Sequence, residues 1–171
     1  LIEEARRVGL RKFVQVGTIC AYPKHTPVPF REDDLWNGYP EETNAPYGVA
    51  KKAVGDYLHA YRELHQLEYT ALALANVYGP RQRPDSMYAA AVPIFARRLL
   101  DGKPITVYGD GGQTRDLINV RDVVSANIAA SEHPDAAGKI FNICTGIETR
   151  LLDLLDVLYE VFPNAPKHEF A

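Results

Sequence analysis

The sequence has few of the features that mark secreted, membrane-spanning or metal-binding chains. Its 171 residues include two cysteines, Cys20 and Cys144, which make neither a disulfide framework nor a paired CxxC metal site. We therefore expect a reducing, cytoplasmic location. The longest apolar stretch, residues 87–96, is interrupted by Pro93. It falls far short of the roughly 20 residues that a membrane span needs, so we expect no membrane partner.

A large excess of charge of one sign is also missing. The chain has 19 Lys and Arg against 22 Asp and Glu, a formal net charge of −3. This balance gives no sign of a surface for nucleic acid or for an anionic membrane, and we expect no nucleic-acid partner. The histidines form no cluster with ligand spacing, so we expect no metal site; they are His25, His59, His65, His133 and His168.

What the sequence does contain is a regular alternation of short apolar runs and helical patterns. With 46% hydrophobic residues, the length fits one domain or two small ones. The alternation predicts an α/β protein with a largely parallel sheet. Strands are predicted at residues 13–16, 69–74, 105–108, 117–118 and 139–143, and helices up to Gly9 and at 46–65, 88–100, 122–130 and 151–161.

Three local details refine this prediction. The Pro-rich segment 22–46 is too polar for a strand and long for a passive connection, which is typical of a functional loop. Asn44 is a candidate cap for the helix that has Pro46 in its first turn. Asp122 is a candidate cap for the helix that runs through Ala130.

Tyr47 and Lys51 form the sharpest candidate site. Their i, i+4 spacing puts them on one face of the predicted helix, with Cβ atoms about 5–6 Å apart. A tyrosine with its ordinary pKa of about 10 needs roughly 4 kcal/mol of stabilisation of its anion to act as a base near pH 7. An ammonium about 4 Å away supplies an energy of that size at an effective dielectric of about 20. An ordinary amphipathic helix remains the alternative for this pair.

Thr18 strengthens the catalytic interpretation. It follows Gly17 at the carboxyl end of an apolar strand, where α/β sheets bind their ligands. A hydroxyl there can hydrogen-bond the substrate oxygen that Tyr47 is to deprotonate. The alternative is a turn threonine bonded to its own backbone.

An ordered set of motifs over nearly the whole chain resembles the extended short-chain dehydrogenases/reductases. More narrowly, it is similar to the NAD-dependent epimerase/dehydratase family that acts on nucleotide sugars. The segments that carry the resemblance are Gly17-Thr18 followed by Tyr22, Pro46-Tyr47-Gly48-Val49-Ala50-Lys51, Ala75-Asn76-Val77-Tyr78-Gly79-Pro80-Arg81, Tyr108-Gly109-Asp110-Gly111, Thr114-Arg115-Asp116, Asn119-Val120-Arg121-Asp122 and Phe141-Asn142-Ile143.

The resemblance implies a Rossmann-like parallel sheet with helices, plus a smaller α/β substrate-binding region. Residues 1–76 would be the later part of the dinucleotide-binding domain, and residues 77–171 mostly substrate-binding and incomplete at the carboxyl end. Thr18 would be the catalytic hydroxyl that also contacts substrate. Tyr47 would be the general base, and Lys51 would bind the nicotinamide ribose and tune that base.

The same resemblance assigns the remaining candidates. Ala75 and the Tyr47/Lys51 pair would contact the cofactor, and Asn76 and Arg115 would contact the nucleotide-diphosphate sugar. The alternatives are an Asx-type turn for Asn76 and a surface ion pair for Arg115. Arg81 is a further possible ligand of an anionic group.

No G-x-G-x-x-G or similar phosphate turn opens a helix in this sequence. We therefore expect the chain to be the later part of a longer enzyme and to be inactive by itself. NAD is the expected cofactor. Without this turn, the sequence does not distinguish NAD from NADP. The resemblance also implies a homodimer when the enzyme is full length.

The branch of the family is the last open point. The position after Thr18 carries no acidic residue, which weighs against 4,6-dehydratases and decarboxylases. Residues 76–142 resemble the 4-epimerases of UDP-sugars, which we take as the first hypothesis. Residues 18–47 resemble GDP-fucose synthases, so the second hypothesis is a GDP-4-keto-6-deoxy-sugar epimerase/reductase. In that enzyme Cys20 would act on the sugar. The alternative for Cys20 is a small buried residue with no catalytic role. A non-catalytic nucleotide-binding protein is the third hypothesis.

Overall fold

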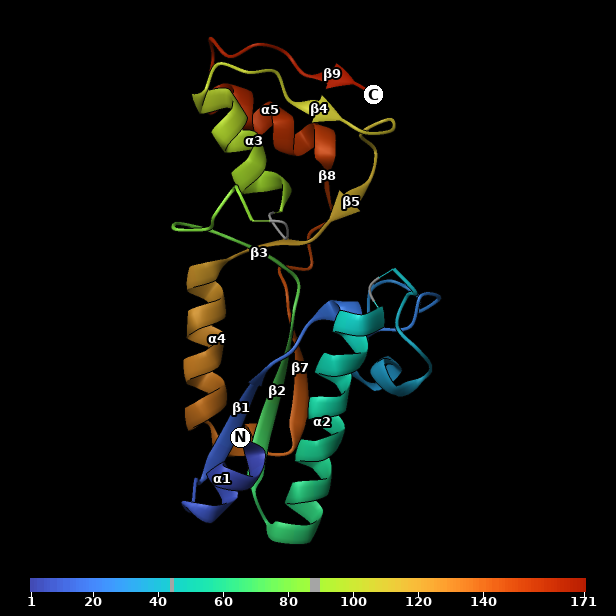
Figure 1. The fold of residues 1–171 in the computed structure, drawn as a ribbon, viewed down its shortest axis with the longest axis vertical. Coiled ribbons are helices and arrows are strands. Elements are labelled where there is room, and N and C mark those ends of the chain that lie inside the picture. The colour runs from blue at the N-terminus through green and yellow to red at the C-terminus, as the bar shows by residue number, and fades with distance from the viewer. Residues whose placement is uncertain (44, 87–89) are drawn as a thin grey trace. The chain divides into compact units, whose positions relative to one another are not determined.

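The computed structural model describes residues 1–43, 45–86 and 90–171, which form two compact units (Figure 1). The first unit consists of Leu1–Ala75 and Arg121–Ile143, and the second of Asn76–Val120 and Cys144–Ala171. The sequence places a boundary after residue 76. The structure places it after Ala75 and adds residues 121–143 to the first unit, because they supply a strand and a helix to its sheet.

The first unit is built on a three-stranded parallel sheet. Its strands are β1 (Lys12–Val16), β2 (Glu68–Leu74) and β7 (Lys139–Ile143), in the order β1-β2-β7. The register pairs Val16 with Leu72, and Leu72 with Phe141. The central strand β2 is buried along most of its length, as expected for a parallel sheet with both faces covered. The predicted α/β fold with a parallel sheet is confirmed.

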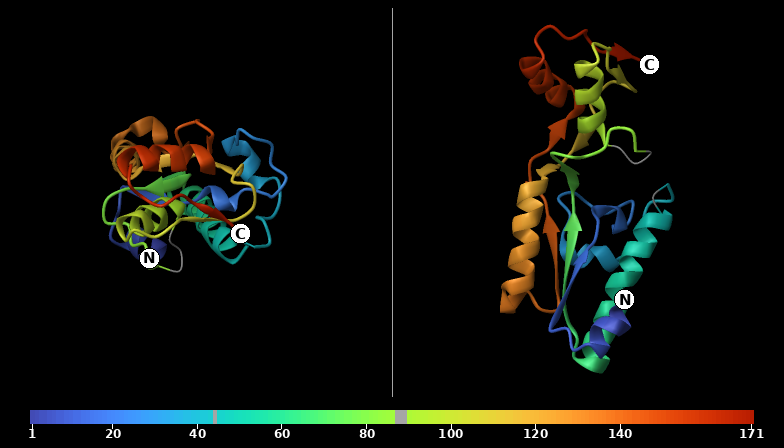
Figure 2. Two further views of the ribbon diagram at one scale, coloured as in Figure 1. Left: turned by 90° about the horizontal axis from the view of Figure 1, so that it is seen from above. Right: turned by 60° about the vertical axis from the view of Figure 1, so that its left-hand side comes forward.

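Two long helices lie against opposite sides of this sheet, α2 (Ala45–His65) and α4 (Val120–Glu132) (Figures 1 and 2). A short helix, α1 (Ile2–Arg7), precedes β1. The fully buried Leu58 anchors α2, and it packs with Tyr69 of β2 in one apolar cluster. In the described ranges, every helix is too short or too polar to span a bilayer.

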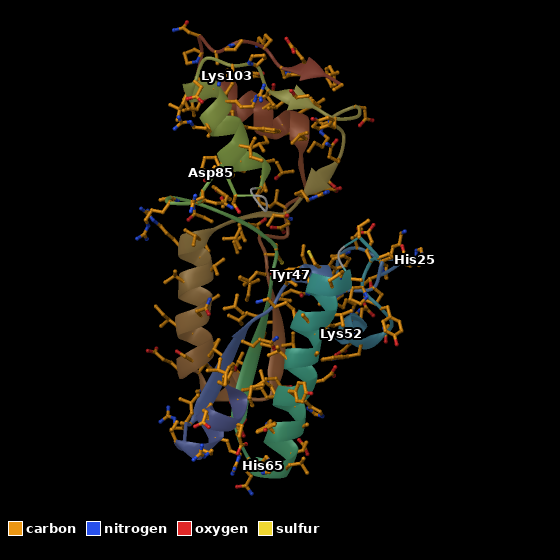
Figure 3. All side chains as sticks on the ribbon, in the orientation of Figure 1. His25, Tyr47, Lys52, His65, Asp85 and Lys103 are labelled. Carbon is orange, nitrogen blue, oxygen red and sulfur yellow. The ribbon has the colours of Figure 1, made fainter. Side chains whose placement is uncertain are left out.

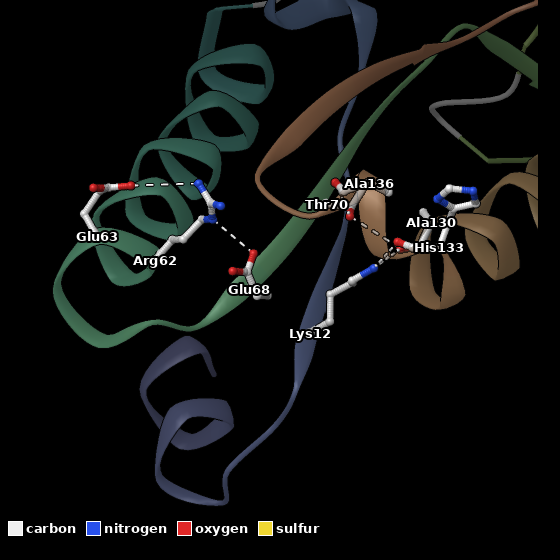
Figure 4. Close-up of polar contacts among 8 residues, drawn as sticks. All are labelled: Lys12, Arg62, Glu63, Glu68, Thr70, Ala130, His133 and Ala136. Atoms are coloured by element: carbon white, nitrogen blue, oxygen red, sulfur yellow. Dashed lines mark hydrogen bonds and ion pairs between the residues drawn. The ribbon is translucent and has the colours of Figure 1, made fainter.

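Polar contacts fix the amino end of the sheet against the last turn of α4 (Figure 4). The ammonium of Lys12 donates to the carbonyls of Ala130 (3.1 Å) and His133 (2.7 Å). A cation at this end satisfies carbonyls that have no partner within the helix. The fully buried Thr70 donates its hydroxyl proton to the Ala136 carbonyl at 2.9 Å. These bonds tie residues about 65 to 120 positions apart into one unit.

The second unit has its own apolar core between two helices, α3 (Ala91–Leu100) and α5 (Leu151–Val161). Its buried members are Phe95, Leu99, Ile105, Val107, Leu155 and Leu158. Three short strand pairs complete the unit: parallel β3 (Asn76–Tyr78) with β6 (Leu117–Asn119), parallel β4 (Thr106–Val107) with β9 (Glu169–Phe170), and antiparallel β5 (Thr114–Arg115) with β8 (Thr149–Arg150).

One local prediction is corrected, and another gains detail. Asp122 is not the cap of α4, because the helix already begins at Val120, and Asp122 lies in its first turn, where an acidic side chain is still favourable. The segment 22–46, which the sequence predicts as a functional loop, includes short elements of structure. It contains the 3₁₀ turn η2 (Glu32–Trp36) and a bridge between Pro23 and Pro40.

Two other predictions touch positions that the structure does not describe. The proposed cap Asn44 lies outside the described residues. So do residues 87–89, where the sequence predicts the start of the helix that the structure begins at Ala91.

Gly48 sets how closely α2 approaches the turn after β1. A Cβ at this position would collide with the Cys20 carbonyl oxygen and lie 2.9 Å from Pro40 Cβ. At Gly55, two turns further along the same helix, an added Cβ would meet Trp36 at 3.5 Å and Gln15 at 3.6 Å, which are ordinary contacts.

We expect Gly48→Ala to lower the free energy of unfolding by about 2 kcal/mol, because overpacking outweighs the gain in helix propensity. The matched variant Gly55→Ala should raise it by up to about 1 kcal/mol. Denaturant unfolding of both variants measures the difference. Equal effects of the two substitutions would show that Gly48 does not control the approach of α2.

Candidate functional site

The first turns of α2 carry Tyr47 and Lys51 side by side, with the Lys51 ammonium 5.8 Å from the centroid of the Tyr47 ring. The Lys51 Nζ donates to the carbonyl of Val16, the last residue of β1, at 2.8 Å. Tyr47 is 52% exposed and projects from α2 in Figure 3. The structure thus brings a phenol and an ammonium together at the carboxyl end of a parallel strand, where α/β sheets bind ligands.

The neighbouring lysine has a different environment. Lys52 Nζ donates to the Gly38 carbonyl at 2.7 Å and lies 5.4 Å from the Trp36 ring. Burial lowers the pKa of Lys52, while the nearby Asp56 raises it. Lys52 therefore holds Trp36 of η2 and the following Gly38 against α2, whereas Lys51 reaches the end of β1.

Thr18 lies at the start of the short 3₁₀ turn η1 (Ile19–Ala21), directly after β1. Its Oγ1 accepts a hydrogen bond from the Cys20 amide at 3.2 Å, and the residue is 8% exposed. Thr18 and Lys51 line the same small cavity of about 20 Å³. Within the part of the chain that the structure describes, no hydrogen bond joins the Thr18 and Tyr47 hydroxyls, although both residues lie near the carboxyl end of β1.

Cys20 is held in place by its backbone. Its amide is bonded to Thr18, and its carbonyl faces Gly48 of α2. The side chain is half-buried, and the thiol is free rather than in a disulfide. Cys20 therefore belongs to the same local cluster as Thr18 and the first turns of α2.

The second unit contains a separate pocket of about 410 Å³, whose wall combines apolar and cationic side chains. Arg115 on β5 is exposed, and its guanidinium donates a hydrogen bond to the carbonyl of the neighbouring Thr114 at 2.6 Å. Arg98 donates to the Pro104 carbonyl, and Arg150 is paired with a carboxylate. Other lining residues are Ala91, Ile94, Phe95, Thr106, Tyr108, Gln113, Leu117, Thr149, Leu151 and Leu154.

The remaining candidates lie in different places. Ala75 ends the first unit, and its amide donates to the Ile143 carbonyl at 3.0 Å. Asn76 begins β3 in the second unit, and its amide donates to the Asp116 carbonyl at 3.1 Å. Arg81 is exposed and has a positive φ of 69°. In the described ranges, no group of three or more His, Cys, Asp or Glu side chains could hold a metal ion.

Asp116 belongs to a segment that carries the family resemblance, but the sequence analysis assigns it no role at the site. Its carboxylate accepts hydrogen bonds from the Thr145 amide and hydroxyl (2.9 Å each, to the same oxygen) and from the Gly146 amide (2.7 Å). It therefore holds the turn after β7 beside the strand that carries Arg115. Its position directly after Arg115 was the only indication in the sequence that Asp116 lies near the site. Its role as an acceptor could not be predicted, because its partners lie 29 and 30 residues away along the chain.

The chain matches the model of the NAD dependent epimerase/dehydratase family over residues 1–144. It belongs to this family. It is 39% identical over 157 residues to the UDP-glucose 4-epimerase of Mycolicibacterium smegmatis, covering 90% of this chain and 47% of that protein.

Solved structures of relatives share the fold. UDP-glucose 4-epimerase from Thermotoga maritima, solved with UDP-glucose, has a TM-score of 0.90 and 35% identity over 100% of this chain and 53% of its own. UDP-glucuronic acid 4-epimerase from Bacillus cereus, solved with UDP-glucuronic acid and NAD, has a TM-score of 0.83 and 29% identity over 99% of this chain and 51% of its own. The predicted Rossmann-like fold is confirmed. The chain spans about half the length of these relatives.

We expect Asp116→Ala to free the turn after β7, because hydrogen bonds to a carboxylate are among the stronger ones. Amide hydrogen exchange at Thr145 and Gly146 should accelerate by at least about tenfold. Asp110→Ala is the matched control, because the Asp110 carboxylate accepts from the Gly112 amide instead. Unchanged exchange at Thr145 and Gly146 in the Asp116 variant would contradict this role.

Proposed function

We propose that the whole protein containing this chain is an NAD-dependent nucleotide-sugar 4-epimerase. The observation that carries the proposal is the Tyr47 phenol beside the Lys51 ammonium, which is bonded to the carboxyl end of β1. A protein that only binds nucleotides has no need for a base in this position. Membership of the family and the relatives' names support the same reaction class.

In this proposal Tyr47 takes the proton from the sugar 4-hydroxyl as that carbon is oxidised, and it returns the proton after the 4-keto sugar has presented its other face. Lys51 stabilises the phenolate electrostatically, and its fixed bond to Val16 keeps the ammonium from moving away. Thr18 orients the sugar oxygen. NAD, when bound, supplies the acceptor and donor of hydride.

The residues present fit the nicotinamide end of such a cofactor. An ammonium and a hydroxyl at the carboxyl end of a parallel strand are suitable donors to ribose hydroxyls. In this proposal Lys51 and Tyr47 hold the nicotinamide ribose, and Ala75 lies along the cofactor. The sequence contains no Gly-rich phosphate turn, so it gives no basis for a choice between NAD and NADP.

The pocket of the second unit is the proposed site for the nucleotide diphosphate. Its apolar wall suits a base, and Arg115 suits a phosphate because guanidinium groups bind phosphate oxygens in pairs. Arg150 forms an ion pair with Asp153 at 2.7 Å, whereas no carboxylate among the described residues pairs with Arg115. In this proposal Asn76 and Arg81 add contacts to the sugar diphosphate.

A homodimer completes the proposal. The outer face of α2 carries an apolar stripe in which Val49 is 43%, Tyr57 63% and Leu64 74% exposed. These residues recur at helical spacing on a helix whose other face packs on the sheet. A second copy of the protein would cover this stripe.

We expect Tyr47→Phe in the whole protein to lower kcat by at least about a thousandfold, with KM for the nucleotide sugar changed by less than about twofold, because the base is lost while the groups proposed to bind the sugar diphosphate remain. Tyr39→Phe, at an exposed position of the same unit, should leave both constants unchanged. Steady-state epimerisation assays measure them. A loss in kcat below about tenfold would count decisively against Tyr47 as the base.

Cofactor balance in the same assay separates this function from the GDP-4-keto-6-deoxy-sugar epimerase/reductase in which Cys20 would act on the sugar. An epimerase shows no net change in cofactor, whereas the reductase consumes NADPH. The sequence has no histidine between His65 and His133 to serve as an acid partner for Cys20, which disfavours the second function.

We also expect Arg115→Gln to weaken binding of uridine diphosphate by at least about tenfold, because a charge-assisted bond to phosphate is lost. Arg97→Gln is the matched control, since Arg97 pairs with Asp101 on an exposed turn of α3 and does not line the pocket. Titration calorimetry gives both dissociation constants. Equal affinities in the two variants would remove Arg115 from the nucleotide site, and tighter binding of guanosine diphosphate would favour the GDP-sugar alternative.

A further inference from the structure

We infer that Gln15, a buried glutamine on β1, is a positioning residue for Lys51; the functional part of this inference rests on the function proposed above. Gln15 is 6% exposed, and its Nε2 donates to the backbone carbonyl of Lys51 at 2.7 Å. The Lys51 Nζ in turn donates to the carbonyl of Val16 at 2.8 Å. Two consecutive residues of β1 therefore hold one lysine of α2 at both its backbone and the tip of its side chain.

This pair of bonds fixes where the ammonium lies. A lysine side chain has several rotatable bonds, so a single contact at its tip leaves its Cα free to shift with the helix. The Gln15 bond removes that freedom because it fixes the backbone of Lys51 relative to the same strand. The distance from the Lys51 Cα to the Val16 carbonyl is then set by adjacent residues of one rigid element.

The fold itself gives little reason for an amide at this position. Gln15 Oε1 is buried and has no hydrogen-bond partner among the described residues, which is unfavourable. The Lys51 carbonyl lies inside α2, where the amide of Gly55 is its helical partner. An apolar side chain at position 15 would thus leave no backbone group of α2 unpaired. Gln15 thus carries the cost of a buried, unpaired oxygen and is not needed to complete the hydrogen bonds of α2. A residue that is unfavourable for stability in this way is typical of a functional position.

The test compares Gln15→Met with wild type in the whole protein. Methionine has a similar length and no amide, so it removes the bond to Lys51 and the unpaired oxygen together. The first measurement is the rate at which Lys51 is acetylated by acetic anhydride, read by mass spectrometry relative to the exposed Lys103. The second is kcat and KM for epimerisation, and the third is the midpoint of thermal unfolding.

Phe13→Leu is the matched control. Phe13 lies two residues before Gln15 on β1 and packs in the cluster of Leu58, Tyr69 and Ala71, which does not include Lys51. It should lower the unfolding midpoint without changing the acetylation of Lys51. This variant separates loss of positioning from general loosening of the sheet.

We expect Gln15→Met to keep or raise the unfolding midpoint, to accelerate acetylation of Lys51 at least fivefold relative to Lys103, and to lower kcat at least tenfold with KM changed less than twofold. Unchanged acetylation of Lys51 would overturn the inference, as would a lower midpoint with kcat unchanged. If wild type does not epimerise a nucleotide sugar, the proposed function fails, while the acetylation measurement still decides whether Gln15 positions Lys51.

Discussion

The close approach of α2 to the end of β1 is the constraint on which the candidate site depends. The absence of a side chain at Gly48 lets the first turns of the helix lie against the Cys20 carbonyl. That approach brings the Lys51 ammonium within 2.8 Å of the Val16 carbonyl while Tyr47 stays exposed beside it. A helix displaced outward by the volume of one methyl group would separate the ammonium from the strand.

The parallel sheet turns this local contact into a fixed one. β2 lies between β1 and β7, so its polar Thr70 can be buried only with a partner, which the Ala136 carbonyl provides. Lys12 binds the last turn of α4 from the other end of β1. The strand that carries Gln15 and Val16 is thus held at both ends, and side chains attached to it have little freedom to move.

The two units carry different candidate functional groups. The first carries a phenol, an ammonium and a hydroxyl at the end of its sheet, and the second carries an apolar pocket with an exposed guanidinium. Each unit has its own apolar core, and the backbone hydrogen bonds of Ala75 and Asn76 go to partners within their own units. The predicted site residues fall in both units: Thr18, Tyr47, Lys51 and Ala75 lie in the first, and Asn76, Arg81 and Arg115 lie in the second.

The sequence by itself determined the elements whose signal is local. The strands at 12–16, 68–74 and 139–143 and the helix of residues 45–65 follow from apolar periodicity, and the Tyr47/Lys51 pair follows from helical spacing. The sequence also predicted strands at 105–108 and 117–118, but only the tertiary structure decided how the short strands pair, because partners such as Thr114 and Arg150 are 36 residues apart. It likewise decided the contacts of Gln15 and Asp116, most of whose partners are backbone groups of distant segments. Hydrogen bonds to a backbone group leave no signature in the sequence, since every residue carries the same amide and carbonyl.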